Sequence, residues 1–409
     1  MQRIFKLLGP GLLYAAAAIG VSHLVQSTRA GADFGFQLLW VVIIANILKY
    51  PFFKIGPKYT AVTGKSLLHG WQQNGPYAIK LFFILTIFTM FTVQAAVTLV
   101  TAGISLHLFN LDFSVSMMSA FLLLVSVIIL LIGKFNVLDN LIKIVVIILT
   151  VATLIAVALA LTENNSYTTP AVPFNFDNKI HIFFLIALIG WMPAPMDVPI
   201  WHSLWSVAKN NENEGNKTTL KDSMLDFNIG YIGTAILACC FLTLGALVMY
   251  RSGQIFSGSA LTFSTQLIGM YTSILGEWAF IFIAVASFAT MFSTTLTCLD
   301  AFPRILSEAY KIERKTERNT YTQWLLVTGA GSLLILFLFI SDMKVMVDFT
   351  TTLSFVVSPI YAYLTYKAMN SKYISEEHHT KGVEKYIAFV GLTFFTIFTI
   401  YFIWLKFLS

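Results

Sequence analysis

Long apolar segments recur along the chain and are separated by short polar stretches. A bilayer's hydrocarbon core needs about 20 apolar residues in a helix, so each segment predicts one membrane-spanning helix. The predicted spans are residues 9–30, 36–55, 79–107, 114–133, 137–162, 180–208, 224–250, 271–301, 322–341, 344–366 and 384–407. Longer loops are expected at 56–78, 163–179, 209–223, 251–270, 302–321 and 367–383. The pattern therefore predicts an all-α membrane protein with eleven transmembrane helices.

Two of the predicted spans are interrupted near their centres. The first reads AAAAIGVSHLVQST, with Gly20 at its centre, and the sixth reads MPAPMDVP, with Pro193, Pro195 and Pro199. Proline removes a backbone donor and blocks the preceding helical turn. In lipid, non-helical backbone survives only beside a cavity or inside protein. Prolines also kink membrane helices without functional consequence, but matched breaks in two spans favour a transport function.

The two interruptions lie five spans apart, as in transporters built from inverted repeats. This spacing predicts a first repeat in residues 1–162 and a second repeat in residues 163–366. Residues 367–409 then supply a cytoplasmic loop and the eleventh helix. We treat the sequence from Met1 as mature protein, because the apolar start continues into the first span.

Composition supports the membrane assignment. Of the 409 residues, 57% are hydrophobic and 11% are charged, whereas ordinary soluble domains carry about 25% charged residues. The net charge of +6 comes from basic residues concentrated in alternate loops, which predicts a cytoplasmic N-terminus and an external C-terminus in a plasma or inner membrane. This asymmetry explains the basic balance without a nucleic-acid partner. The three cysteines support no disulfide framework.

Ionisable and polar side chains accompany both interruptions. Asp197 lies in the second, where an acid costs at least about 2.5–3.5 kcal/mol and normally faces water, an ion or a partner. Alternatively, it is a structural acid that accepts N–H bonds from the freed half-helix. His202 is a candidate proton relay or a buried structural histidine. Ser22, His23 and Gln26 follow Gly20, and residues 23 and 26 share a helix face.

These side chains suggest a substrate site at the crossing of the two interrupted helices. His23 and Asp197 could supply imidazole and carboxylate to a divalent cation. Met192 and Met196 could add thioethers, although methionine in an apolar helix more often serves packing. The predicted substrate-binding residues are Gly20, Ser22, His23, Gln26, Met192, Met196 and Asp197.

Several stretches resemble the NRAMP family of divalent-metal transporters, which have the LeuT-type fold. GPGLLYAAAAIG followed by AGADFGFQLLW resembles the family's first span, and PIWHSLW resembles the end of its sixth. The metal-site motifs differ. Gly20 stands where the family has the aspartate of DPGN, and His23 where it has the asparagine. The methionine of the sixth-span motif falls either at Pro195 or, with an insertion, at Met192.

The resemblance and the interruptions together predict a secondary active transporter that works by alternating access. The first interpretation is transport of a divalent metal ion of the Mn, Mg or Fe class, coupled to protons through His202. The alternative is a carrier of a small organic solute or anion that transports no metal. A third hypothesis is a transport-incompetent sensor on the same scaffold. The expected partners are the transported solute and the bilayer, the expected state is a monomer, and no cofactor or enzymatic activity is expected.

Overall fold

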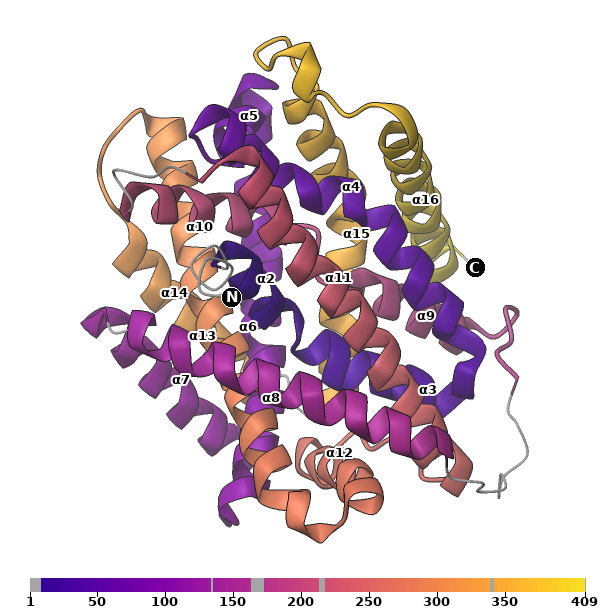
Figure 1. Ribbon diagram of the computed structural model, residues 1–409. Helices are drawn as coiled ribbons and strands as arrows, with labels where there is room; N and C mark the ends of the chain where they lie inside the picture. The colour runs from indigo at the N-terminus through magenta and orange to yellow at the C-terminus, as the bar shows by residue number, and fades with distance from the viewer. Residues whose placement is uncertain (1–8, 134, 163–172, 213–217, 339–341, 409) are drawn as a thin grey trace.

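The computed structural model describes residues 9–133, 135–162, 173–212, 218–338 and 342–408, and these residues fold into helices joined by short connections (Figure 1). No strand occurs among them. The first half comprises α2 (Pro10–Ala18), η1 (Ser22–Ser27), α3 (Thr28–Phe34), η2 (Gly35–Leu38), α4 (Leu39–Thr63), α5 (Leu67–Gln73), α6 (Pro76–Phe109), α7 (Val115–Ile132) and α8 (Phe135–Thr162). The second half comprises α9 (Lys179–Trp191), α10 (Val198–Glu212), α11 (Leu220–Leu244), η3 (Gly245–Tyr250), α12 (Ala260–Leu275), η4 (Glu277–Ala279), α13 (Phe280–Arg314), α14 (Tyr321–Leu338), α15 (Met343–Met369), η5 (Glu376–His378) and α16 (Gly382–Phe407).

Apolar length and outward-facing side chains mark this bundle as a membrane protein. Within the described residues, eight segments are long and apolar enough to cross a membrane. They are Ser22–Thr63, Tyr77–Phe109, Val115–Ile132, Leu220–Tyr250, Glu277–Arg314, Tyr321–Leu338, Met343–Met369 and Gly382–Phe407. Large apolar side chains such as Phe121 on α7 and Phe389 on α16 are exposed on the helix surfaces. Such faces suit hydrocarbon rather than water.

Helices of the two halves pack against one another throughout the bundle. Helix α11 packs on α2, α10 on α4, and both α13 and α15 on α6. Figure 1 shows α16, in yellow, along one edge of the molecule beside α4. The end of α2, the end of α9 and the start of α10 are buried within the bundle.

The regions of the first and sixth predicted spans each contain more than one helical element. Helix α2 ends at Ala18, and the chain becomes helical again at Val21, immediately before the π-helical turn η1. Helix α9 ends at Trp191 and α10 begins at Val198. The intervening residues 19–20 and 192–197 are the interruptions around which the candidate site is built.

Some predicted boundaries were wrong. The eighth span was predicted as one helix over 271–301, but α12 ends at Leu275 and α13 begins at Phe280. Gly276 separates them with a φ of 92°, a backbone conformation that favours glycine. Helix α13 then continues to Arg314 through a region predicted as a loop, α5 lies in a predicted loop, and α12 begins in one. The predicted loop segments 163–172 and 213–217 and the end of the ninth span at 339–341 lie outside the described residues.

Candidate functional site

The first interruption is short, and uncharged groups satisfy its backbone. The amide of Gly20 donates to the carbonyl of Ala18 at 2.9 Å, and the amide of Leu24 donates to the carbonyl of Gly20 at 2.9 Å. The Ser22 hydroxyl donates to the Ala18 carbonyl at 2.6 Å. From α13, the Thr294 hydroxyl donates to the Ala16 carbonyl at 3.1 Å. Neighbouring amides and two hydroxyl groups are therefore enough to bridge this gap.

The second interruption is wider, and a charged side chain fills it. Residues 192–197 separate α9 from α10 and leave the carbonyl groups at the end of α9 without continuing helix. The Lys49 amine, which comes from α4, donates to the carbonyl oxygens of Ile189 at 2.8 Å, Gly190 at 2.8 Å and Ala194 at 3.0 Å. Lys49 therefore caps the C-terminal end of α9.

Geometry indicates that Lys49 carries its positive charge. The residue is completely buried. A protonated lysine has three donors and no acceptor, and its three carbonyl partners use all of them. The C-terminal end of a helix carries partial negative charge, which also favours a cation at this position. The ammonium group of Lys49 is thus a resident cation of the second interruption.

Asp197 lies near enough to Lys49 to interact with it electrostatically. Its side chain is buried at the start of α10 and interacts electrostatically with Lys49 and with the backbone amides of Asp197 and Val198. One carboxylate oxygen, Oδ1, is buried and has no hydrogen-bond partner among the described residues. The acid and the lysine therefore lie near each other at the second interruption, but they form no ion pair within 4.0 Å among the described residues.

A small cavity lies between the two interruptions. Its volume is about 20 Å³, close to the space that one water molecule requires. Its walls come from α2, η1, α6, α9, α10 and α13 and are largely apolar, including Val93, Trp191 and Trp201. Ser22, Thr294 and Cys298 add hydroxyl and thiol groups to the lining, which contains no carboxylate or imidazole. The described state of the protein therefore encloses little space at the crossing.

His23 turns away from this cavity. Its Nε2 donates to the carbonyl oxygen of Thr234 on α11 at 2.9 Å, because a carbonyl can only accept. Its Nδ1 lies 2.7 Å from the Ser22 hydroxyl oxygen. Both ring nitrogens thus have protein partners, and no hydrogen bond or ion pair in the described residues joins His23 to Asp197. The predicted pairing of His23 with Asp197 is not a contact in this state.

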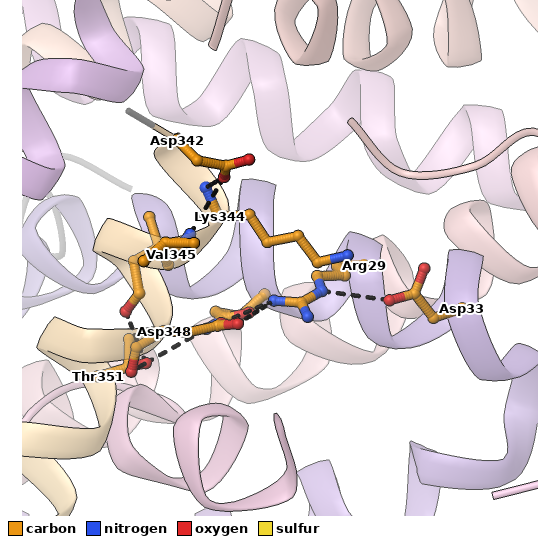
Figure 2. A network of polar contacts seen from close by, with 9 residues as sticks. Arg29, Asp33, Asp342, Lys344, Val345, Asp348 and Thr351 are labelled. Atoms are coloured by element: carbon orange, nitrogen blue, oxygen red, sulfur yellow. Dashed lines mark hydrogen bonds and ion pairs between the residues drawn. The ribbon is translucent and has the colours of Figure 1, made fainter. Parts of the chain in front are cut away.

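A separate polar network joins Arg29 and Asp33 on α3 to Asp348 on α15 (Figure 2), and Gln26 of η1 also contacts Asp348. The Arg29 guanidinium donates to both oxygens of Asp348 at 2.7 and 2.8 Å and to Asp33 at 3.2 Å. The Gln26 amide donates to Asp348 at 3.1 Å and to Thr351 at 3.3 Å. Hydrogen bonds between an arginine and a carboxylate are among the stronger contacts in proteins. Gln26 therefore helps to join η1 to α15.

The other predicted side chains are buried among apolar neighbours. Met192 and Met196 are buried, and neither lines the small cavity. The His202 ring lies parallel to Tyr14, with ring centres 6.0 Å apart, and is also 6.0 Å from Phe227. Its Nδ1 has no hydrogen-bond partner among the described residues. Pro193 and Pro195 lie in the second interruption, and Pro199 lies in the first turn of α10.

Comparison with known proteins identifies the family of this chain. Residues 11–405 match the model of the Nramp family, described as natural resistance-associated macrophage protein-like. The chain belongs to the Nramp family. A Pasteurella multocida (strain Pm70) protein named "Uncharacterized protein PM0681" is 39% identical over 405 residues, which cover 98% of this chain and 92% of that protein.

Solved structures agree with the fold of an Nramp protein. The Eremococcus coleocola manganese transporter superposes with a TM-score of 0.74 at 15% identity, covering 98% of this chain and 86% of that one. MhsT in complex with L-phenylalanine superposes with a TM-score of 0.62 at 14% identity, covering 98% of both chains. The LeuT-type fold expected from the sequence is therefore confirmed, and this chain is a membrane transporter by family.

The ligand set expected at an Nramp metal site is not assembled here. Among the described residues, no three His, Cys, Asp or Glu side chains come together in a way that could hold a metal ion. Asp197 is the only carboxylate in either interruption, and Lys49 lies near it. The departures from the family motifs at Gly20 and His23 thus coincide with a site that already contains a cation.

Two features that organise this Nramp scaffold were not predicted from the sequence. Lys49 lies within an apolar stretch, ANILKYPFFKIG, where a lysine needs a partner inside the protein, and this signal could have been found. The motif Gly9–Pro10–Gly11 also has a structural role. The amides of Gly9 and Gly11 donate to the two carboxylate oxygens of Asp226 on α11, at 3.1 and 2.8 Å. Nothing in the local sequence around Asp226 indicates this partner.

Proposed function

We propose that this Nramp protein is a secondary carrier that moves a small organic solute by alternating access at the crossing of α2–η1 and α9–α10. The observation that carries the proposal is Lys49, whose ammonium group already lies in the second interruption and contacts three carbonyl oxygens. A free divalent cation at the same crossing would be repelled by this charge in a medium of low dielectric constant.

The character of the cavity supports the same cargo class. Apolar and aromatic walls with a few hydroxyl groups suit a small organic molecule better than a bare divalent cation, which prefers several oxygen, nitrogen or sulfur ligands. The volume of about 20 Å³ holds no such molecule, so the described state is closed around the crossing and must open to bind one. This requirement is consistent with alternating access.

Divalent metal transport is the second candidate, and family membership favours it. The Eremococcus coleocola structure is that of a manganese transporter. Metal transport by this chain would require Asp197 to leave Lys49 and join other oxygen or sulfur ligands. Proton coupling through His202 remains a prediction, because no hydrogen bond within the described residues connects its ring to Asp197.

We also propose the membrane orientation inferred from the sequence. Basic residues concentrate on the side that includes the N-terminus, which supports a cytoplasmic N-terminus and an external C-terminus. A cysteine added after Ser409 in a chain without Cys239, Cys240 and Cys298 should then react with an impermeant maleimide in intact cells. Labelling only after lysis would show the opposite orientation, with the C-terminus in the cytoplasm.

Proteoliposome assays separate the two cargo classes. Uptake of Mn²⁺, Zn²⁺, Ca²⁺ and Mg²⁺ would be followed with internal metal-sensitive dyes, and uptake of labelled small carboxylates, amino acids and amides would be followed in parallel. We expect no metal uptake above empty liposomes and saturable uptake of at least one organic probe. Ser22→Trp, which fills the cavity wall, is the matched loss-of-transport variant. Metal uptake abolished by Asp197→Ala would support the second candidate and overturn the first.

A further inference from the structure

The contacts of Lys49 have the arrangement of a cation-binding site. Three backbone carbonyl oxygens converge on one point at 2.8–3.0 Å, and a buried carboxylate lies near enough to interact electrostatically. Backbone carbonyls and half-helix C-terminal ends are the groups with which broken-helix transporters coordinate a co-transported cation. In this chain the point is filled by the side chain of another helix.

We propose that the carbonyl groups of Ile189, Gly190 and Ala194, with Asp197 as countercharge, form a monovalent-cation site that the protein fills permanently with its own Lys49 ammonium. The carrier therefore needs no mobile cation at the second interruption. Removing the lysine side chain should open this site to a free cation. The inference concerns the site alone and holds whichever cargo the protein carries.

The atoms that are removed when Lys49 is truncated indicate which cation would fit the site. Lys49→Ala removes three methylene groups and the ammonium group, so n-propylammonium reproduces the missing atoms. It has the same three N–H donors for the three carbonyl oxygens. Its alkyl chain would replace the buried lysine stem. Na⁺ and K⁺ could bind the same oxygen atoms but would leave the stem volume unfilled.

The test is chemical rescue of thermal stability in the purified full-length protein. Wild type and Lys49→Ala would be heated in detergent with n-propylammonium chloride, sodium chloride, potassium chloride or 1-propanol. We expect Lys49→Ala to lose roughly 5–10 °C in Tm, as follows from uncovering a buried charge partner. Added n-propylammonium should restore about half of this loss or more, because binding to the folded state alone raises its stability. Wild type should not respond.

The controls distinguish a cation site from simple packing. The uncharged 1-propanol has the same chain length and should give less rescue than n-propylammonium. Asp197→Asn combined with Lys49→Ala should weaken the rescue several-fold, because the countercharge is gone. Equal rescue by 1-propanol would show a packing role and overturn the proposal. Absence of rescue by n-propylammonium, sodium and potassium in folded Lys49→Ala would also overturn it.

A second variant keeps the test informative if Lys49→Ala does not fold. Lys49→Gln retains two N–H donors without a charge and should fold with a lower Tm. We expect the Tm of this variant to lie well below that of wild type, because one carbonyl loses its donor and Asp197 loses its countercharge. A Tm equal to that of wild type would show that the positive charge is unnecessary and would refute the inference.

Discussion

The carbonyl groups freed at the two helix interruptions accept hydrogen bonds from different kinds of donor. The first is two residues long, and its freed carbonyl groups accept from backbone amides and from the hydroxyl groups of Ser22 and Thr294. The second is six residues long, and its carbonyl groups accept from the buried ammonium of Lys49. The free carbonyl groups of the short interruption accept hydrogen bonds from nearby groups. Those of the wider interruption accept from a donor on another helix.

The two interruptions also differ in the charge of their side chains. The first interruption contributes the neutral side chain of Ser22 to the cavity lining, whereas the second holds two ionisable side chains, Lys49 and Asp197, outside that lining. A buried pair costs desolvation energy, and breaking it by removing one partner is strongly destabilising. The second interruption should therefore be the more sensitive to substitution.

The largest expected effect is at Lys49. Lys49→Met keeps the apolar stem of the side chain but leaves three carbonyl groups and Asp197 without a cation, and we expect a loss of about 3–5 kcal/mol of stability. Thermal unfolding followed by intrinsic fluorescence would measure it. Lys49→Met combined with Asp197→Asn removes both charges and should recover part of the loss. A double variant less stable than either single one would contradict the charged-pair interpretation.

A smaller effect is expected from a matched pair of glycine substitutions. A Cβ at Gly190 would collide with the backbone carbonyl of Thr351 on α15, so the two helices would have to separate. A Cβ at Gly20 would lie 2.8 Å from the Cγ2 atom of Thr294, a side chain that can move more easily than backbone. We expect Gly190→Ala to cost about 1–3 kcal/mol and Gly20→Ala to cost less. If thermal unfolding showed a larger loss of stability for Gly20→Ala than for Gly190→Ala, the proposed difference between the two interruptions would be wrong.

The smallest effect is expected for the hydroxyl groups of the first interruption. Thr294→Val removes one hydrogen bond to the Ala16 carbonyl and should cost about 0.5–1.5 kcal/mol. Ser22→Ala should cost a similar amount through the Ala18 carbonyl. Both variants should remain folded and suitable for transport assays. A loss as large as that of Lys49→Met would show that the two interruptions are equally demanding.

Much of this architecture could be predicted from the sequence because it follows from apolar length and from helix-breaking residues. Gly20 and the prolines around residue 195 lie at the interruptions, and the resemblance carried by GPG and PIWHSLW led to the correct family. The boundary between α12 and α13 was missed because the apolar residues on both sides of Gly276 and Glu277 together reach the length of one span. A glycine followed by a single acid carried too little weight against that length to separate two helices.

The arrangement of the candidate site was harder to predict, since it depends on which distant residues meet. His23 and Asp197 suggested a metal because both are near interruptions, but His23 contacts Thr234 and Asp197 interacts with Lys49. Gln26 was expected at the substrate and instead contacts Asp348 and Thr351. Sequence position identified the polar residues inside the membrane, and tertiary packing decided their partners.

The contact between Asp226 and the start of α2 has a consequence for the evolution of such chains. Proline has no amide hydrogen, so Gly9–Pro10–Gly11 presents two N–H groups on either side of a residue that cannot compete with them. Both bind one carboxylate on α11, which lies 215 residues from Gly11 in the sequence. A Cβ at Gly11 would also collide with the backbone carbonyl of Asp226. Among relatives, the glycine–proline–glycine triplet and this distant aspartate should therefore be inherited or lost together, as two halves of a single motif.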